Sequence, residues 1–188
     1  NPNPDAKSSS LNIGITGFLL NDKEKLLSNK NSEFSLNRSV INSCGSIVEI
    51  TSKAILEMYK FKRLSTLPAK HQSNKESHIR DLLSNSTELT RDQIKKVLSV
   101  NPNKIYATAK GWNSTMRSLL ATIFISMKEY PHHPMHFLIS DVLLFDEIYS
   151  LSFDRDEASH GNNTKYSREQ ALHYINIVDK FLKKILVD

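Results

Sequence analysis

The chain has 188 residues, 39% of them hydrophobic and 24% charged, which is long enough for one domain with a substantial apolar core. It contains only 5 Gly and 6 Pro, a scarcity that disfavours a turn-rich β-sandwich and favours helices. Its net charge of +5 is compatible with a polyanionic partner such as nucleic acid, and equally with a lysine-rich solvated surface.

The sequence contains neither a candidate membrane span nor a recognisable secretory signal. No apolar run approaches the roughly 18 residues that a membrane span needs, so no membrane association is expected. The first ten residues, "NPNPDAKSSS", have neither the basic start nor the apolar stretch of a secretory signal. The single cysteine, Cys44, cannot form an internal disulfide and is expected to be a small core residue. A cytoplasmic location follows as the expectation.

The N-terminal third is predicted to contain a leader and one long helix. Residues 1–37 are interpreted as the leader, with a candidate accessory helix. From about residue 39 to 64, apolar residues recur at steps of three and four, which is typical of one face of an amphipathic helix. That face comprises Val40, Ile41, Cys44, Ile47, Val48, Ala54, Ile55, Met58 and Tyr59.

Shorter elements are predicted in the middle of the chain. Residues 65–78 are interpreted as a loop that overlaps the start of a short helix over 75–85. A second short helix follows Thr90, because Thr90 and Gln93 have the spacing of a capping box. The string "VNPNK" at 100–104 is interpreted as a turn.

The C-terminal half is predicted to hold three further helical stretches. Residues 113–129 place Met116, Leu119, Leu120, Ile123, Phe124 and Met127 on one side. The run over 137–161 carries inward Leu138, Ile139, Val142, Leu143, Phe145, Ile148, Tyr149 and Leu151, and Gly161 is expected to end it. Ser167 and Gln170 form a second capping-box pattern before a final helix with the stripe Ala171, Ile175, Val178, Phe181, Leu182 and Ile185. We therefore expect an all-α bundle of four to five main helices, with residues 38–188 as its domain.

One short stretch, "FDRDEASHGNN" at 153–163, carries residues suited to phosphodiester chemistry. Cleavage of RNA without a metal needs a group that moves a proton, and His160 has the side chain whose pKa lies nearest neutrality. It also needs a fixed cation beside the phosphate, which the planar guanidinium of Arg155 can supply. On a regular helix these two positions point about 140° apart, at about 3.6 residues per turn, so they do not converge automatically. They can meet if the helix ends at the histidine, and the arginine side chain is also long enough to reach around a turn.

The spacing alone is a weak signal, because the chain contains it twice. Arg168 and His173 also stand five positions apart, but inside the final helix and with no glycine after the histidine. The first pair has context: it ends a long amphipathic helix, a polar residue follows the arginine, and Gly161 follows His160.

In this context the sequence resembles the HEPN superfamily of all-α domains, whose members often carry an arginine, a polar residue, three further residues and a histidine before their last helix. The string "INSCGSIVEITSKAILEMYKF" at 41–61 is similar to the first core helix of RiboL-PSP-type HEPN proteins, with Glu49 in its S-x-x-E string. Two departures stand out. Asp156 occupies a position where asparagine is commoner, and Asn162 stands where HEPN toxins paired with nucleotidyltransferases have tyrosine.

The resemblance implies a metal-independent endoribonuclease that cuts single-stranded RNA as a homodimer, with no cofactor and no metal. It implies proton transfer by His160, phosphate stabilisation by Arg155 and an orienting role for Asp156. Glu49 and Asn162 are the supporting candidates for the site or for RNA contact. A toxin–antitoxin or antiviral defence setting, with an inhibitor or antitoxin protein as partner, also comes from the family alone.

Other interpretations of these residues stay open. Arg155 and His160 could be a solvated helix end, with the histidine favoured by the helix dipole. The cluster His132, His133 and His136 invites a metal site but lacks an established ligand spacing, and Trp112 is either a packing anchor or a base-stacking surface. The whole domain could instead be a non-catalytic module that binds RNA or a protein, or the effector part of a longer protein.

Overall fold

The computed structural model of the chain describes residues 21–24, 34–59, 72–84, 88–111, 114–128, 130, 132–160 and 165–186, and every regular element within them is a helix. The helices with bounds are α2 (Phe34–Tyr59), α4 (Gln72–Ser84), α5 (Arg91–Leu98), α6 (Pro102–Ala109), α7 (Met116–Ser126), α8 (Phe137–Ser140), α9 (Val142–Ser159) and α10 (Arg168–Leu186). The all-α prediction is confirmed. The predicted number, four to five main helices, is too low for this described part of the chain.

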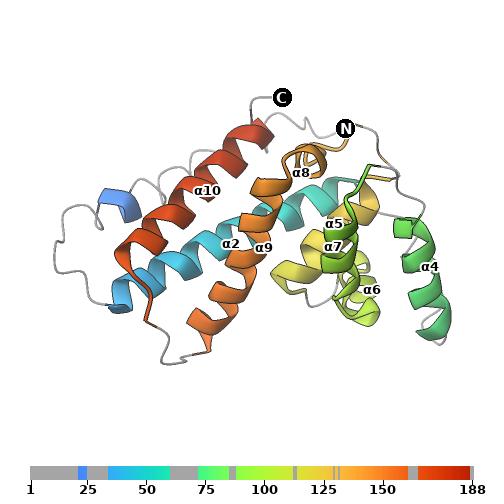
Figure 1. The fold of residues 1–188 in the computed structure, drawn as a ribbon, viewed down its shortest axis with the longest axis horizontal. Coiled ribbons are helices and arrows are strands. Elements are labelled where there is room, and N and C mark those ends of the chain that lie inside the picture. The colour runs from blue at the N-terminus through green and yellow to red at the C-terminus, as the bar shows by residue number, and fades with distance from the viewer. Residues whose placement is uncertain are drawn as a thin grey trace.

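Helix α2 is the longest described helix and packs against several of the others. Its 26 residues make it about 39 Å long at about 1.5 Å per residue. It packs against α10, α9 and α7, and Figure 1 shows it running beside α10 and behind α9 toward the group formed by α4, α5, α6 and α7. Most of its predicted apolar face is buried, including Cys44, but Met58 is 61% exposed and does not face the core.

Helix α7 is more deeply buried than its predicted one-sided pattern suggested. Every residue from Met116 to Ser126 is buried except Arg117. A helix surrounded by neighbours must be apolar on all sides or satisfy its polar groups locally. Thr122 does so, because its hydroxyl donates to the Ser118 carbonyl oxygen at 2.6 Å. Helix α7 is therefore the central helix of the group at this end of the fold.

Both predicted capping boxes are present. The Thr90 hydroxyl oxygen accepts from the Gln93 backbone N–H at 3.2 Å, and Oε1 of Gln93 accepts from the Thr90 backbone N–H at 2.9 Å. Ser167 and Gln170 exchange the same two bonds, at 3.1 and 2.9 Å. Each pair satisfies backbone groups that the first turn of a helix leaves without partners.

Three local predictions are wrong. Within the loop expected over 65–78, the chain is already helical from Gln72, where α4 begins. The string "VNPNK" begins a helix, because Asn101 caps α6 through a 2.8 Å bond from the Asn103 backbone and Pro102 occupies its first turn. The run over 137–161 is broken at Asp141, whose backbone N–H closes α8 while its carboxylate caps α9. Because α9 starts afresh there, Leu143 is turned outward and is 69% exposed instead of facing inward.

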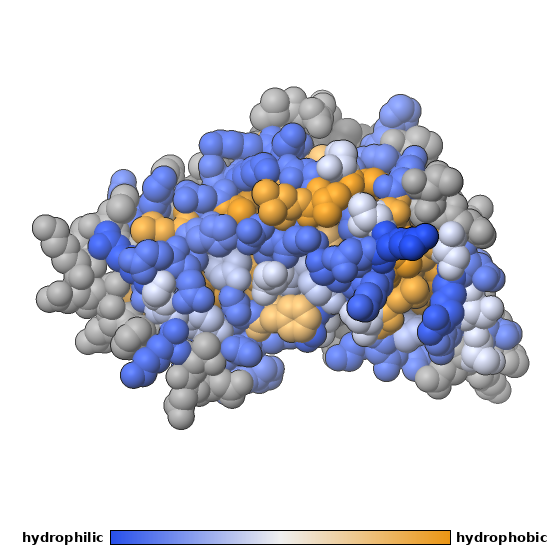
Figure 2. Space-filling view, in the orientation of Figure 1, coloured by the Kyte–Doolittle hydropathy of each residue, from blue (hydrophilic) through white to orange (hydrophobic). Residues whose placement is uncertain are grey.

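The visible face in Figure 2 is mostly hydrophilic, with apolar side chains exposed in patches between hydrophilic ones. Among the described helices, none has both the length and the apolar composition that crossing a membrane demands. Helix α2 begins at Phe34, before the domain start predicted at residue 38, and that division stays a prediction.

Candidate functional site

Arg155 lies where α9 crosses α2, and Gly45 of α2 allows the two helices to approach closely at this point. A Cβ atom built on Gly45 would lie 2.3 Å from Cγ of Arg155 and 2.8 Å from its Cβ, far inside ordinary contact distance. Only a residue without a side chain fits there. The aliphatic stem of Arg155 is therefore pressed against the backbone of α2.

The guanidinium of Arg155 is held by a carboxylate one turn along α2. Nη2 of Arg155 lies 2.8 Å from Oε2 of Glu49, and the two side chains are 25% and 18% exposed. Glu49 stands four positions after Gly45, so both lie on the same face of α2. Oε2 of Glu49 is buried and accepts no well-aligned hydrogen bond, so the contact is an ion pair whose strength comes from charge and burial.

Asp156 belongs to the same cluster but is shared between two arginines. Its Oδ1 lies 3.8 Å from Nη1 of Arg155, whereas its Oδ2 accepts a 2.7 Å hydrogen bond from Nη2 of Arg117. The Arg117 guanidinium also lies over the Phe153 ring, 4.4 Å from its centre. Two cations and two carboxylates thus form one connected group across α2, α7 and α9.

His160 lies apart from that group, at the exposed end of α9. Its backbone N–H donates to the Asp156 carbonyl oxygen at 3.1 Å, so the helical path continues up to the histidine. Within the described part of the chain, no hydrogen bond or ion pair joins the His160 and Arg155 side chains. Asn162 and Gly161 lie outside the described residues.

The last turns of α9 are fixed by three neighbours. Ser159 donates to Oδ1 of Asn42 on α2 at 2.9 Å, and Tyr166 donates to the Asp154 carbonyl oxygen at 2.8 Å. Tyr174 of α10 donates to the Asp154 carboxylate. Burial first, and the Asp154 charge second, raise the pKa of Tyr166 to about 12, and burial also raises the pKa of Tyr174. Both phenols therefore remain donors, and the backbone that carries Arg155 and His160 is firmly placed.

The second arginine–histidine pair lies in a different setting. Arg168 and His173 both belong to the continuous helix α10, and Nε2 of His173 lies 2.8 Å from Oε2 of Glu147 on α9. This histidine therefore contacts α9 from an exposed face of a continuous helix.

The histidine cluster at 132–136 does not converge on a common point. His133 is buried, its Nδ1 accepts from the Met135 backbone at 3.2 Å, and its Nε2 lies 3.0 Å from the Ser126 hydroxyl. Burial, with a smaller effect of His136, lowers the pKa of His133 to about 4. His136 instead approaches Glu88 at 3.8 Å. Within the described ranges, no three His, Cys, Asp or Glu side chains are grouped as metal ligands. Trp112 lies outside those ranges.

Sequence reasoning missed two residues of the cluster. Arg117 carried no motif, since its partner Asp156 is 39 positions away and only the packing of α7 on α9 brings them together. Gly45 did carry a signal, because a glycine inside a strong helical pattern often marks a close approach of another element. No protein-family model matches this chain, and no curated protein or solved structure matches it either.

Proposed function

We propose that this chain is a metal-independent endoribonuclease that cleaves single-stranded RNA through Arg155 and His160. The observation that carries the proposal is the placement of these residues on one firmly anchored helix end. Arg155 is held at the α2 crossing by Gly45 and Glu49, and the exposed His160 ends the same helix. The HEPN resemblance supplies the reaction class.

The proposed chemistry needs two proton-transfer groups. A base takes the proton of the 2′-hydroxyl as its oxygen attacks phosphorus, and an acid gives a proton to the departing 5′-oxygen. The products are a 2′,3′-cyclic phosphate and a 5′-hydroxyl. One His160 supplies one of these groups, so a homodimer with two copies facing one cleft is part of the proposal. Arg155 would stabilise charge on the phosphate, with Asp156 and Glu49 orienting its guanidinium.

The non-catalytic alternative has a specific observation in its favour. The Arg155 guanidinium already has Glu49 and Asp156 beside it, so a phosphate must compete with two carboxylates. In this alternative the cluster is a structural clamp between α2 and α9, and the domain binds RNA or a protein without cutting. A cytoplasmic defence or toxin setting and an inhibitory partner belong to the catalytic proposal only.

The test is cleavage of single-stranded RNA in EDTA by the wild type, Arg155→Lys and His160→Ala. The chain offers a matched control in His173→Ala, which removes a histidine at the same spacing from an arginine. Loss of a general acid or base typically slows a reaction by about 10²–10⁴-fold, so His160→Ala should fall by that factor and His173→Ala should not. Arg155→Lys keeps the charge beside Glu49 but loses the planar fork, and it should also cut slowly.

Circular dichroism and urea unfolding must show that the variants are folded. The proposal is wrong if the wild type is inert in a range of single-stranded RNAs, or if His160→Ala cuts as fast as His173→Ala. RNA binding without cleavage would support the non-catalytic alternative. Specific activity that does not change across the concentration range of dimer formation would remove the two-copy part of the mechanism.

A further inference from the structure

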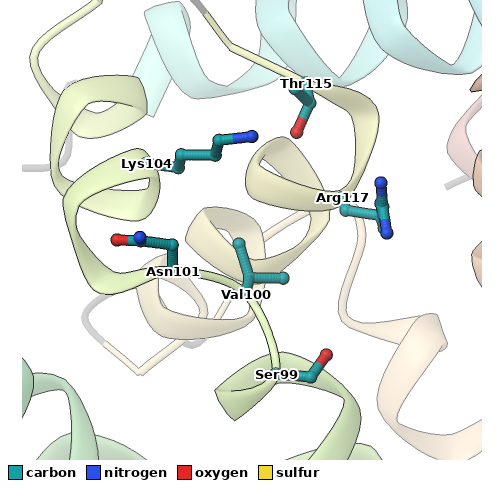
Figure 3. A pocket seen from close by; sticks show the side chains of 6 residues that line it. All are labelled: Ser99, Val100, Asn101, Lys104, Thr115 and Arg117. Atoms are coloured by element: carbon teal, nitrogen blue, oxygen red, sulfur yellow. The ribbon is translucent and has the colours of Figure 1, made fainter.

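A separate pocket lies next to the cluster, between the end of α5 and the starts of α6 and α7. Its volume is about 280 Å³, close to the lower end of small-ligand pockets, and it is lined by Ser99, Val100, Asn101, Lys104, Thr115 and Arg117. Figure 3 shows the Lys104 ammonium of α6 reaching toward the side where Thr115 and Arg117 of the α7 start lie. Two cations from different helices therefore approach one small hollow.

Most of the neutral polar groups of this pocket already have hydrogen-bond partners. The Ser99 hydroxyl donates to a carbonyl oxygen of α5 at 2.6 Å. The Asn101 side-chain oxygen caps α6, and the Thr115 hydroxyl caps α7. The donors that remain for a ligand belong mainly to Lys104 and Arg117. No carboxylate is among the residues that line the pocket, and Lys104 makes no ion pair within the described ranges. The hollow is therefore suited to an anion.

Arg117 connects this pocket to the candidate site. One of its nitrogens is bound to Asp156, which leaves further N–H groups of its five-donor fork for another acceptor. Its guanidinium lies on the Phe153 ring, and Phe153 is 43% exposed. An exposed aromatic ring beside a cation is the arrangement on which unpaired nucleic-acid bases stack. Asp156 in turn lies next to Arg155, so the pocket and the candidate catalytic arginine are joined by direct contacts.

We propose that this pocket is a phosphate-binding subsite for single-stranded RNA, with Lys104 and Arg117 as its ligands and Phe153 as the adjoining stacking surface. The RNA identity of the ligand rests on the proposed ribonuclease function. The preference for a phosphate group rests only on the two cations and on the absence of a carboxylate from the lining. The subsite would hold a nucleotide flanking the cleaved bond and fix the strand relative to Arg155.

Binding of a non-cleavable probe tests this separately from catalysis. The probe is a fluorescent oligoribonucleotide whose 2′-hydroxyls are methylated, titrated with the full chain and followed by anisotropy. The variant Lys104→Ala loses one charge-assisted contact, and it should bind the probe about tenfold more weakly than the wild type. The slope of log affinity against log salt should fall by about 0.7, as for one lost phosphate contact on a single strand.

Three variants complete the design. Lys104→Arg keeps the positive charge and should bind like the wild type. Lys184→Ala removes one charge from an exposed position on α10 and should leave affinity and salt slope unchanged. Phe153→Leu keeps an apolar side chain but removes the ring, and it should weaken RNA binding without altering binding of inorganic phosphate, measured by calorimetry.

The proposal is overturned if Lys104→Ala and Lys184→Ala bind the probe equally well, or if the wild type does not bind it. It is also overturned if inorganic phosphate binding depends on Lys104 while RNA binding does not, because the pocket would then hold small anions only. Failure of cleavage with a Lys104-dependent affinity for the probe would contradict the proposed catalysis and leave the subsite standing.

Discussion

Replacement of Gly45 by alanine is the sharpest test of how Arg155 is positioned. The new Cβ would lie 2.3 Å from Arg155 Cγ, more than an ångström short of ordinary contact at 3.4 Å, and 2.8 Å from Arg155 Cβ. The Cγ atom can move by rotation of the side chain. The Cβ atom cannot, since it is fixed to the backbone of α9, so the two helices must separate.

The expected size follows from two opposing effects. Overpacking of a close contact costs about 1–3 kcal/mol, whereas alanine in place of glycine inside a helix contributes roughly 0.5–1 kcal/mol of stability. We expect a net loss of about 1–2 kcal/mol in the free energy of unfolding. Separation of the helices would also lengthen the 2.8 Å contact between Arg155 and Glu49, so cleavage should fall with stability.

Urea unfolding followed by circular dichroism measures this loss as a lower midpoint at constant slope. The same substitution in an Arg155→Ala background should cost less, because two of the three close contacts, those with Cγ and Cδ, are then absent. If Gly45→Ala instead raises stability by about 1 kcal/mol, as glycine replacement does in an open helix, then α2 and α9 do not meet at Gly45 and the reasoning fails.

Three further predictions concern stability and reactivity. Burial lowers the pKa of His133 from 6.5 to about 4, so between these pH values the unfolded chain binds a proton at this histidine and the folded chain does not. The contribution of His133 to stability should therefore be complete above pH 6.5 and be lost as the pH falls toward 4. His133→Gln should reduce this loss in urea titrations at several pH values. Parallel profiles for the two proteins would contradict it. Gly111 has a φ of 77° and open space around it, so Gly111→Ala should cost about 1–2 kcal/mol of unfolding free energy through the backbone alone, and Gly111→Asn less. Equal costs would argue against a left-handed conformation there. Cys44 is buried, which raises its thiol pKa to about 12, so iodoacetamide should label it in urea and not in the folded protein; rapid labelling of the folded chain would show that α2 opens.

Much of the local structure could be predicted from the sequence because its causes are local. The apolar periodicity indicates a helix whatever packs on it, and residues 39–59 of the predicted range 39–64 lie in α2, while 60–64 lie outside the described residues. The capping boxes at Thr90 and Ser167 depend on side chains only three residues apart. The helix start at Asn101 has an equally local cause, since an asparagine followed by proline suits a helix N-terminus as well as a turn.

The candidate site can be predicted from the sequence only in part, because its contacts join residues far apart in the chain. Arg155, Asp156 and His160 could be singled out by residue type and spacing, and the angle between the first and the last follows from the helical repeat alone. Their catalytic role remains a prediction. Glu49 could be named as a supporting candidate only through the family resemblance, because it is about a hundred positions from Arg155 and no spacing rule pairs the two. Nothing in the sequence pointed to Arg117.

By itself, the sequence determined that the chain is helical, which residues form most of the apolar faces, and where several helices begin. These properties depend on interactions within one or two turns. Only the tertiary structure decided that Arg155 packs directly on Gly45, that Leu143 and Met58 lie outside the core, and that every residue of α7 except Arg117 is buried. The physical reason is that periodicity shows which side of a helix is apolar, whereas the crossing of helices decides which neighbour covers that side and how closely it approaches.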